Sequence, residues 1–469
     1  MNLMTLDKTS ETPLTEQIVQ GVQKLIENRA LRSGTRMPSI RGFGVAHGVS
    51  RFTVVQAYDR LVAGAYLESR PGSGFYVMAQ RKSPGRVTPS IKLDKAMDVL
   101  WLLRNALNQP GRVHAPGAGW LPHDWMDSGG IQKSLRAIAQ KNAEYLTGYG
   151  APQGYSLLRQ ILQQRLSELS IYLQAEQLLL TNGATHALDL VARYYVRPGD
   201  TVFVDDPGYF ILYGTLKSYG AKIVGVPWNN DGPDTTKLEQ LLKAHKPKLF
   251  FTNTILHNPT GASISQSVAF RLLQLAEAHK MVIVEDDVYG DFHAEKISRL
   301  ATLDQLNRVI YIGSFSKTIS SSIRVGYIAA SAEVVQQLTD LKLLSGITTS
   351  ETNERVIYEM LVSGQYRKYL SRLHKNLQQG QEKTLDYFDR IGLSPYLEPK
   401  GGMFIWVKMP AHINMIEMAS EASAKEIMLA PGNLFRPHHE PTEWMRFNVA
   451  SCDVNEHRKF IRQYIEKNQ

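Results

Sequence analysis

Apolar residues recur at helical spacing near the start of the chain. One face of a first helix carries the apolar residues Leu14, Ile18, Val22, Leu25 and Ile26, a spacing that predicts an amphipathic helix. Pro38 opens a second short helix over residues 40–46, because proline is tolerated at the start of a helix. Ser50 is a good N-cap for a third helix over residues 51–63. Two short strands around a Pro-Gly-Ser-Gly turn are expected over residues 66–78.

Further along the chain, short apolar runs alternate with segments of helical spacing. The apolar runs predict strands over residues 178–181, 201–204, 248–252, 281–284 and 309–312. Strands that alternate with helices at regular intervals form a mainly parallel sheet with helices on both faces. Ligands of such sheets bind at the carboxyl ends of the strands. The residues that directly follow each apolar run are therefore the candidates for chemistry.

Length, charge and cysteine content limit the classes of protein to which the chain can belong. A chain of 469 residues is too long for one small core, so two or more domains are expected. The formal net charge of +9 favours polyanionic partners such as nucleic acid or phosphate ligands. The single cysteine, Cys452, excludes an intramolecular disulfide, which fits a reducing cytoplasm. We expect a cytoplasmic protein without a membrane partner, since no run approaches the ~20 apolar residues of a span and no signal peptide opens the chain.

The order helix, helix, turn, helix and hairpin is that of a winged helix-turn-helix, whose helix after the turn enters the major groove of DNA. Residues 28–56 hold five arginines and no acidic residue, which suits the phosphates of double-stranded DNA. Arg51 and Thr53, at the start of the third helix, are the best candidates for DNA contacts. The other candidate DNA-binding residues are Ser39 and Arg41 toward the backbone, Ser50 before the third helix, and Gly72 in the wing. The alternative is a three-helix protein-interaction module with a solvated basic face.

A polar, basic stretch with two prolines, residues 80–89, indicates a flexible spacer. Apolar residues at helical spacing then predict a helix within residues 91–107 that docks on the large domain. We therefore divide the chain into a DNA-binding domain over residues 1–80, a linker with a docking helix over residues 81–115, and a large domain over residues 116–469.

The stretch around Lys317 combines a lysine, several hydroxyl groups and an arginine. Lys317 lies among small and hydroxylated residues directly after the strand predicted over 309–312, and Arg324 follows seven residues later. A lysine that forms a Schiff base is held on a rigid element, and a dianionic phosphate is bound by hydroxyls and a guanidinium. The combination indicates a site for pyridoxal 5'-phosphate, and the alternative is a solvated lysine in a serine-rich loop. The spacing GxxxxGK of a nucleotide-binding loop is absent.

The ends of the other predicted strands carry residues that complete such a site. Asp286 would keep the pyridine nitrogen protonated, and Tyr289 and Asn258 would donate to the ring oxygen. Tyr209 would cover one face of the ring. The phosphate would be held by Ser314, Arg324 and the main-chain amides of Gly183, Ala184 and Thr185 at a strand-to-helix turn. No metal site is expected.

Two known families share these motifs. Residues 12–78 resemble the DNA-binding domain of GntR-type bacterial regulators in the stretches Met37-Pro38-Ser39-Ile40-Arg41, Val49-Ser50-Arg51-Phe52-Thr53-Val54 and Ser69-Arg70-Pro71-Gly72-Ser73-Gly74-Phe75. Residues 115–469 resemble the fold-type-I aminotransferases in Asn182-Gly183, Asp206-Pro207-Gly208-Tyr209, Asn258-Pro259-Thr260-Gly261, Asp286-Asp287-Val288-Tyr289, Ser314-Phe315-Ser316-Lys317 and Pro399-Lys400-Gly401-Gly402-Met403-Phe404. The second resemblance implies an α/β fold with a smaller C-terminal α+β part.

The aminotransferase resemblance adds two residues to the candidate site. It implies a homodimer with shared sites, in which Tyr149 reaches the phosphate bound to the partner subunit. It also makes Arg446 the residue that pairs with the α-carboxylate of a substrate, a role that suits the bidentate guanidinium. From the residues alone, a surface salt bridge stays open as the role of Arg446.

A GntR-type domain joined to an aminotransferase-like body resembles the MocR group of bacterial transcriptional regulators. This resemblance implies a head-to-tail homodimer that binds operator DNA, and a body that binds pyridoxal 5'-phosphate and senses it or an amino acid or amine. Ser320-Ser321-Ser322 departs from the usual run before Arg324, which leaves the ligand preference open. Two alternatives remain: an active aminotransferase with an accessory DNA-binding domain, and a DNA-binding protein whose body no longer holds the cofactor.

Overall fold

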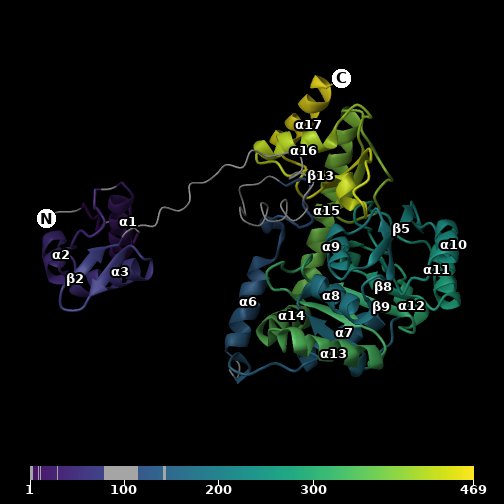
Figure 1. The fold of residues 1–469 in the computed structure, drawn as a ribbon, viewed down its shortest axis with the longest axis horizontal. Coiled ribbons are helices and arrows are strands. Elements are labelled where there is room, and N and C mark those ends of the chain that lie inside the picture. Colours follow the sequence, from purple (N-terminus) through teal and green to yellow (C-terminus); the bar gives the residue numbers. More distant parts are fainter. Residues whose placement is uncertain are drawn as a thin grey trace. The chain divides into compact units, whose positions relative to one another are not determined.

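A computed structural model describes residues 4–78, apart from 9, 11 and 29, and residues 115–468, apart from 141–143. The contacts divide the chain into two compact units, Met1–Ser90 and Ile91–Gln469, both drawn in Figure 1. The expected linker and docking helix fall almost wholly outside the described residues, so the domain boundaries stay predictions. No helix in the described parts of the chain is long and apolar enough to cross a membrane.

The small unit contains three helices and a hairpin: α1 (Leu14–Glu27), α2 (Ile40–His47), α3 (Arg51–Ala63), β1 (Leu67–Arg70) and β2 (Gly74–Val77). The two strands are antiparallel. The apolar sides of the elements form one core, whose fully buried members include Ile18, Val22, Phe43, Val54, Tyr58 and Leu61. Gly48 ends α2 in the left-handed conformation with φ 62°, which glycine adopts without strain. This arrangement confirms the predicted winged helix-turn-helix.

The large unit is built on an eight-stranded sheet. In chain order its strands are β3 (Leu178–Thr181), β4 (Thr201–Asp206), β5 (Lys222–Asn229), β6 (Gly232–Pro233), β7 (Leu249–Thr252), β8 (Val282–Asp286), β9 (Val309–Ser314) and β10 (Gly326–Ala329). They lie side by side in the order β3-β10-β9-β8-β7-β4-β5-β6. The strands β9, β8, β7, β4 and β5 are parallel, whereas β10 is antiparallel to both of its neighbours and β6 to β5. The mainly parallel sheet is therefore confirmed.

Helices cover both faces of this sheet (Figure 1). In β9, Val309 and Tyr311 belong to one apolar core and Ile310 and Ile312 to the other, because successive residues of a strand point to opposite faces. One face is covered by α8 (Gly183–Tyr195), α9 (Phe210–Ser218) and α13 (Ala332–Gly346). The other is covered by α7 (Ser156–Ser167), α10 (Thr235–Ala244), α11 (Gln266–Ala278) and α12 (Leu300–Asp304).

A smaller α+β part lies at the C-terminal end of the large unit (Figure 1). Its four strands, in the order β11-β12-β14-β13, are β11 (Ser394–Pro395), β12 (Phe404–Lys408), β13 (Ala430–Pro431) and β14 (Trp444–Asn448). All pairs in this sheet are antiparallel. The remaining helices of the large unit are α6 (Ser128–Ala139), α14 (Glu351–Val362), α15 (Gln365–Arg390), α16 (Met415–Ala424) and α17 (Asn455–Lys467).

Three boundaries at the carboxyl edge of the sheet differ from the sequence expectation. The strands β4, β8 and β9 each continue two residues beyond their apolar runs, to Asp206, Asp286 and Ser314, because the main-chain pairing with their neighbouring strands continues to these residues. Helix α8 begins at Gly183, within the strand-to-helix turn expected at Gly183, Ala184 and Thr185. Gly183 has φ 77°, so the turn out of β3 and the start of the helix occur at one residue.

Candidate functional site

The lysine that follows β9 faces a cavity in the large unit. Lys317 lines this cavity, and its Nζ donates a hydrogen bond to the carbonyl oxygen of Gly119 at 2.5 Å. Burial, together with the guanidinium groups of Arg446 and Arg324 and against the opposing effect of Asp286, lowers the pKa of Lys317 to about 8. A lysine with a lowered pKa is more often unprotonated near neutral pH and is therefore a better nucleophile.

The carboxylate at the end of β8 lines the same cavity. Oδ1 of Asp286 is buried and has no hydrogen-bond partner among the described residues. Burial raises the pKa of Asp286 to about 7, and the nearby Asp287 adds to this effect. A buried carboxylate oxygen without a donor is costly, so this position calls for a bound N–H group or cation.

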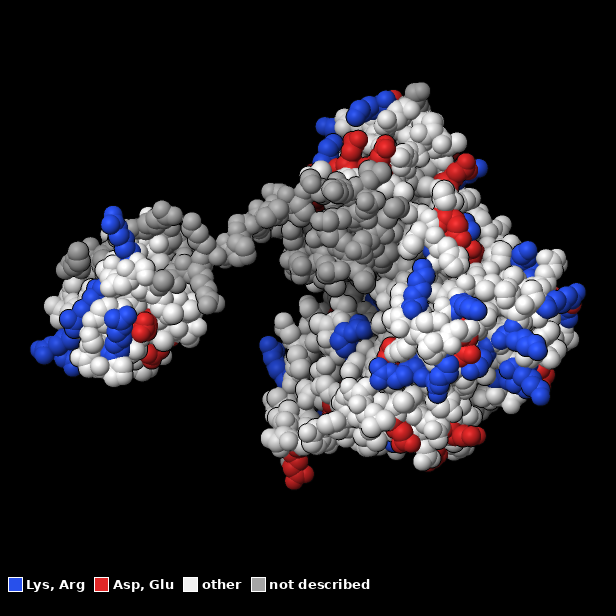
Figure 2. All heavy atoms as spheres, in the orientation of Figure 1, with Lys and Arg blue, Asp and Glu red and all other residues white. Residues whose placement is uncertain are grey.

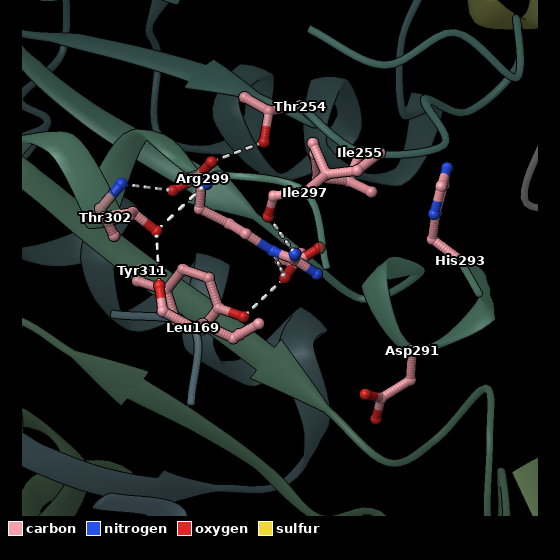
Figure 3. A network of polar contacts seen from close by, with 12 residues as sticks. Leu169, Thr254, Ile255, Asp291, His293, Ile297, Arg299, Thr302 and Tyr311 are labelled. Carbon is pink, nitrogen blue, oxygen red and sulfur yellow. Dashed lines mark hydrogen bonds and ion pairs between the residues drawn. The ribbon is translucent and has the colours of Figure 1, made fainter. Parts of the chain in front are cut away.

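A network of buried polar groups holds the end of β8 in place (Figure 3). Asp287 accepts hydrogen bonds from Arg299 Nε at 2.9 Å and from the Tyr311 hydroxyl at 2.6 Å. Glu285 accepts from the Thr254 hydroxyl at 2.5 Å and from two main-chain amides at the start of α12. Neighbouring residues of a strand point to opposite sides. The network therefore anchors the residues on either side of Asp286 and leaves its carboxylate directed to the cavity.

The start of α8 and the loop after β9 form one end of the cavity. Arg324 donates from Nη1 to Ser316 Oγ at 3.1 Å and from Nη2 to the Asn182 carbonyl at 3.2 Å. A Cβ atom at Gly183 would lie 2.7 Å from Arg324 Nη2, and the φ of 77° at this residue favours glycine. The cavity wall here includes Ala184, Thr185, Ser314, Ser316 and Arg324. The amides of a helix start beside a guanidinium suit a phosphate group.

The middle of the cavity is formed by residues from the ends of β4, β7 and β8. Tyr209 lines it, and burial raises the pKa of Tyr209 to about 12. The Asn258 amide donates to the Tyr289 hydroxyl at 3.4 Å. Asn253, which the sequence does not single out, accepts from the Asn258 main-chain amide at 2.8 Å and donates to the Asp286 carbonyl at 2.7 Å. It thereby joins the groups expected at the ring nitrogen and at the ring oxygen.

Arg446 lies inside the protein and makes no ion pair within the described residues, so the surface salt bridge left open by the sequence is wrong. Its side chain donates to Asn258 Oδ1 at 2.6 Å and to the Gly117 carbonyl at 2.7 Å. The guanidinium also lies over the rings of Phe404 and Phe435. Burial lowers the pKa of Arg446 to about 10. A buried guanidinium with only neutral partners is available to an anionic group.

The cavity has a volume of about 1070 Å³, which exceeds the usual lower limit for a site that binds a small molecule. It brings together Lys317, Asp286, Tyr289, Asn258, Tyr209, Ala184, Thr185, Ser314 and Arg324. Three features of the cavity match pyridoxal 5'-phosphate. The Asp286 oxygen without a partner suits the ring nitrogen, Lys317 with its lowered pKa suits the aldehyde, and the end of the cavity with Arg324 suits the phosphate. The residues present therefore fit this cofactor.

We expect the cofactor-free protein to bond covalently to pyridoxal 5'-phosphate faster as the pH rises, with the steepest change near pH 8. Only the unprotonated Nζ of Lys317 attacks an aldehyde, and its pKa lies at about 8, below the usual 10.5. The reactive fraction therefore levels off above about pH 9, whereas an ordinary lysine continues to deprotonate to about pH 11. Stopped-flow absorbance measures the rate, with Nα-acetyl-lysine, whose only amine is on the side chain, as the control. A rate that climbs through about pH 10 contradicts this prediction.

Three candidate residues are not part of the cavity wall: Gly183, Tyr149 and Arg446. The Tyr149 side chain is 81% exposed on the loop before α7. Arg446 lies just behind Asn258 instead of on the surface of the cavity. The cavity also extends past the candidate cofactor residues along an apolar and aromatic wall that the sequence does not reveal: Trp120, Leu121, Trp125, Met126 and Ile131.

In the small unit, two of the candidate DNA contacts also cap helices. Ser39 Oγ accepts from the Gly42 amide at 3.0 Å, and Ser50 Oγ accepts from the Thr53 amide at 3.1 Å. Arg41 and Arg51 are exposed. Gly72 is exposed at the turn of the hairpin with φ 73°. Lys and Arg side chains gather along one edge of the small unit in Figure 2, so this unit offers a cationic surface.

Comparisons with known proteins match each unit to a family. Residues 119–463 match the model of aminotransferases of class I and II, and residues 14–77 match that of the bacterial regulatory proteins of the gntR family. The HTH-type transcriptional regulator YdfD of Bacillus subtilis is 27% identical over 97% of this chain and 96% of its own length. NorG, an HTH-type transcriptional regulator of Staphylococcus aureus, is 26% identical over 85% of this chain and 92% of its own. Among solved structures, a kynurenine aminotransferase of Pyrococcus horikoshii is 25% identical and aligns with a TM-score of 0.72 over 78% of this chain and 94% of its own.

Proposed function

The chain belongs to the aminotransferase class I and II family and carries a GntR-type DNA-binding domain, and from this combination we propose that it is a transcriptional regulator of the MocR type. Its winged helix binds operator DNA, and its body senses pyridoxal 5'-phosphate, an amino acid or amine, or both. The observation that carries the proposal is the joining, in one chain, of a winged helix-turn-helix with exposed arginines to a cavity that Lys317, Asp286 and Arg324 line together. Relatives that match along most of the chain are named as transcriptional regulators. A regulator of bacterial genes acts in the cytoplasm.

In this proposal the cavity residues hold pyridoxal 5'-phosphate, which supplies an aldehyde for covalent capture of amines and an electron-withdrawing ring. Lys317 provides the amine of the resting state, and Asp286 pairs with the ring nitrogen. Asn258 and Tyr289 donate to the ring oxygen, and Tyr209 covers the ring. The phosphate is held by the amides of Gly183, Ala184 and Thr185, by Ser314 and Arg324, and by Ser316, whose hydroxyl contacts Arg324.

Arg446 would bind the carboxylate of an amino acid effector. Its partners Asn258 and Gly117 are neutral, and the guanidinium is 3% exposed. A carboxylate that replaces the Gly117 carbonyl turns an uncompensated buried charge into a paired one, which favours binding. The amino group of the same effector then competes with Lys317 Nζ for the aldehyde.

The regulator would act as a head-to-tail homodimer with shared sites. Tyr149 supports this arrangement, because an aromatic side chain that is 81% exposed is available to a second subunit. In this role the Tyr149 hydroxyl donates to the phosphate bound by the other subunit. Replacing Tyr149 with Phe should then weaken cofactor binding, and mixing this variant with a cofactor-deficient variant should restore a fraction of the sites.

The deciding experiment measures binding of the full-length protein to DNA that flanks its own gene, with and without pyridoxal 5'-phosphate, and then with candidate amino acids and amines. Selective binding that shifts with the cofactor supports the proposal. Selective binding that is the same with and without the cofactor contradicts cofactor sensing. A lack of selective binding, together with formation of keto product from an amino donor, would establish an aminotransferase instead.

We expect replacement of Arg51 by Ala to weaken binding to the selected DNA about tenfold or more, since one good contact between arginine and DNA contributes about 1–3 kcal/mol. Cofactor binding should not change, because Arg51 belongs to the small unit. Fluorescence anisotropy at several salt concentrations measures the affinity. The slope of the wild-type affinity against salt concentration gives the number of DNA phosphates that the protein neutralises. Arg271→Ala, which removes an exposed arginine from α11, is the control. An equal loss in both variants would argue against a DNA contact by Arg51.

A further inference from the structure

The outward face of α3 centres on an aromatic residue. The buried residues of α3 are Val54, Ala57, Tyr58 and Leu61, and at about 100° per residue the opposite face centres on Phe52. The Phe52 side chain is 70% exposed. Gln56, one turn later on this face, is also exposed. Within the described part of the small unit, the side-chain amide of Gln56 has no hydrogen-bond partner.

The surface around Phe52 is polar and cationic, so it does not form an apolar docking patch. Arg51 and Arg41 are exposed nearby in the sequence, and residues 28–56 contain no acidic side chain. The exposed Asp59 follows one turn after Gln56 on this face. Isolated exposed apolar residues are common on proteins. Phe52, however, lies in the first turn of α3. In a helix-turn-helix domain, the first turn of this helix contacts the base edges of DNA. The charge of the surrounding surface favours nucleic acid as its partner.

The hydroxyl groups at the start of α3 are already engaged with one another. Ser50 Oγ accepts from the Thr53 amide at 3.1 Å and lies 2.8 Å from Thr53 Oγ1. Thr53 is also half-buried. Phe52 and Gln56, like Arg51, are therefore exposed side chains of the first two turns with no internal partner among the described residues.

We propose that Phe52 and Gln56 determine sequence specificity by reading one thymine and one adenine in each half-site of the operator. This inference rests on the proposed DNA-binding function. The phenyl ring contacts the C5 methyl group of thymine, the apolar group of the major groove, and the glutamine amide pairs with N6 and N7 of adenine. Side chains four residues apart on a helix are separated by about 6 Å, which corresponds to about two base-pair steps of 3.4 Å.

The test of Phe52 begins with DNA selected from a random pool by the full-length protein. Each thymine of the selected duplex is then replaced by deoxyuridine, which removes only the methyl group. At one position per half-site, wild type should lose about fourfold in affinity, the effect of one buried methyl. The Phe52→Ala variant should bind the thymine and deoxyuridine duplexes equally well. Phe52→Leu, which keeps an apolar side chain, should retain part of the difference.

The test of Gln56 uses 7-deazaadenine, which removes the N7 acceptor, at each adenine near the sensitive thymine. Wild type should lose about tenfold in affinity at one adenine, and Gln56→Ala should be indifferent to this replacement. Gln56→Glu, whose carboxylate cannot donate to N7, should abolish the preference for adenine and thereby separate loss of pairing from loss of side-chain volume.

The control for removal of an exposed phenyl group is Phe270→Ala, because Phe270 is 62% exposed on the large unit. It should keep the wild-type response to deoxyuridine. An equal deoxyuridine response in wild type and Phe52→Ala would overturn the inference while leaving DNA binding intact. A change in oligomeric state in Phe52→Ala, with unchanged base preference, would also overturn it and would assign Phe52 to a contact between copies. Failure to select any DNA would overturn the proposed function itself.

Discussion

Replacing Lys317 with Ala will abolish covalent attachment of pyridoxal 5'-phosphate to the protein. The lysine is the reactive amine that the structure places in the cavity, beside Asp286 and Arg324, and no other lysine lines the cavity within the described residues. The visible absorbance of lysine-bound cofactor should disappear, while weak non-covalent binding remains through Arg324 and the amides of α8. Absorbance spectra of the purified variant, titrated with the cofactor, measure both effects.

A matched control is available because the large unit contains a second buried lysine. Lys342 is 1% exposed, and burial lowers its pKa to about 8 as well. Its Nζ, however, donates to the Pro152 and Leu180 carbonyls and to the Thr349 hydroxyl. Borohydride reduction of the wild-type complex, followed by peptide mapping, should place the pyridoxyl group on Lys317. A label on Lys342, or persistent absorbance in Lys317→Ala, would show that the attachment site is elsewhere.

Replacing Asp286 with Asn should weaken binding of pyridoxal 5'-phosphate about a hundredfold or more. The carboxylate is buried and its Oδ1 has no partner among the described residues, so a protonated pyridine nitrogen would pair with it at full strength. Removing one member of a buried ion pair costs about 3–5 kcal/mol, which corresponds to more than a hundredfold in affinity. Titration of the cofactor-free variant, followed by fluorescence quenching, measures the affinity.

Strand β4, which is separated from β8 by β7, offers the control for this substitution. Asp206 at the end of β4 is an acid whose pKa is raised by burial, but it pairs with Arg436 at 3.1 Å and does not line the cavity. Asp206→Asn should therefore lower the free energy of unfolding and leave cofactor affinity nearly unchanged. If Asp286→Asn bound the cofactor within about threefold of wild type, a loss of less than 1 kcal/mol, the assignment of Asp286 to the ring nitrogen would be wrong.

The sequence predicts the large sheet well because its strands are buried on both faces. Such strands appear as continuous apolar runs, as in Val309 to Ile312, and the polar residues after each run meet at one edge. Lys317 and Asp286 are predictable on this basis, since each comes shortly after an apolar run, and Arg324 is predictable from its place seven residues after Lys317. Their placement in one cavity agrees with that prediction, although the roles of the individual residues stay proposals.

Other features depend on contacts that no local pattern contains. Gly117 and Gly119 contact Arg446 and Lys317 across separations of 329 and 198 residues. Asn253 has no signal of its own, because an asparagine after a strand is common in turns. The outward position of Phe52 becomes visible only when the core of the small unit shows which face of α3 is buried.

The hydrogen bond from Lys317 Nζ to the Gly119 carbonyl makes the segment around Gly119 sensitive to what Lys317 holds. A nitrogen bonded covalently to a cofactor has fewer N–H groups to donate, so cofactor and carbonyl compete for one atom. Gly119 lies among the first described residues after the stretch that leads from the DNA-binding unit. Coupling between two binding sites is reciprocal. If binding of the cofactor changes the affinity for operator DNA by some factor, binding of operator DNA changes the affinity for the cofactor by the same factor. Promoter occupancy would then itself influence how tightly the cell's pyridoxal phosphate is retained.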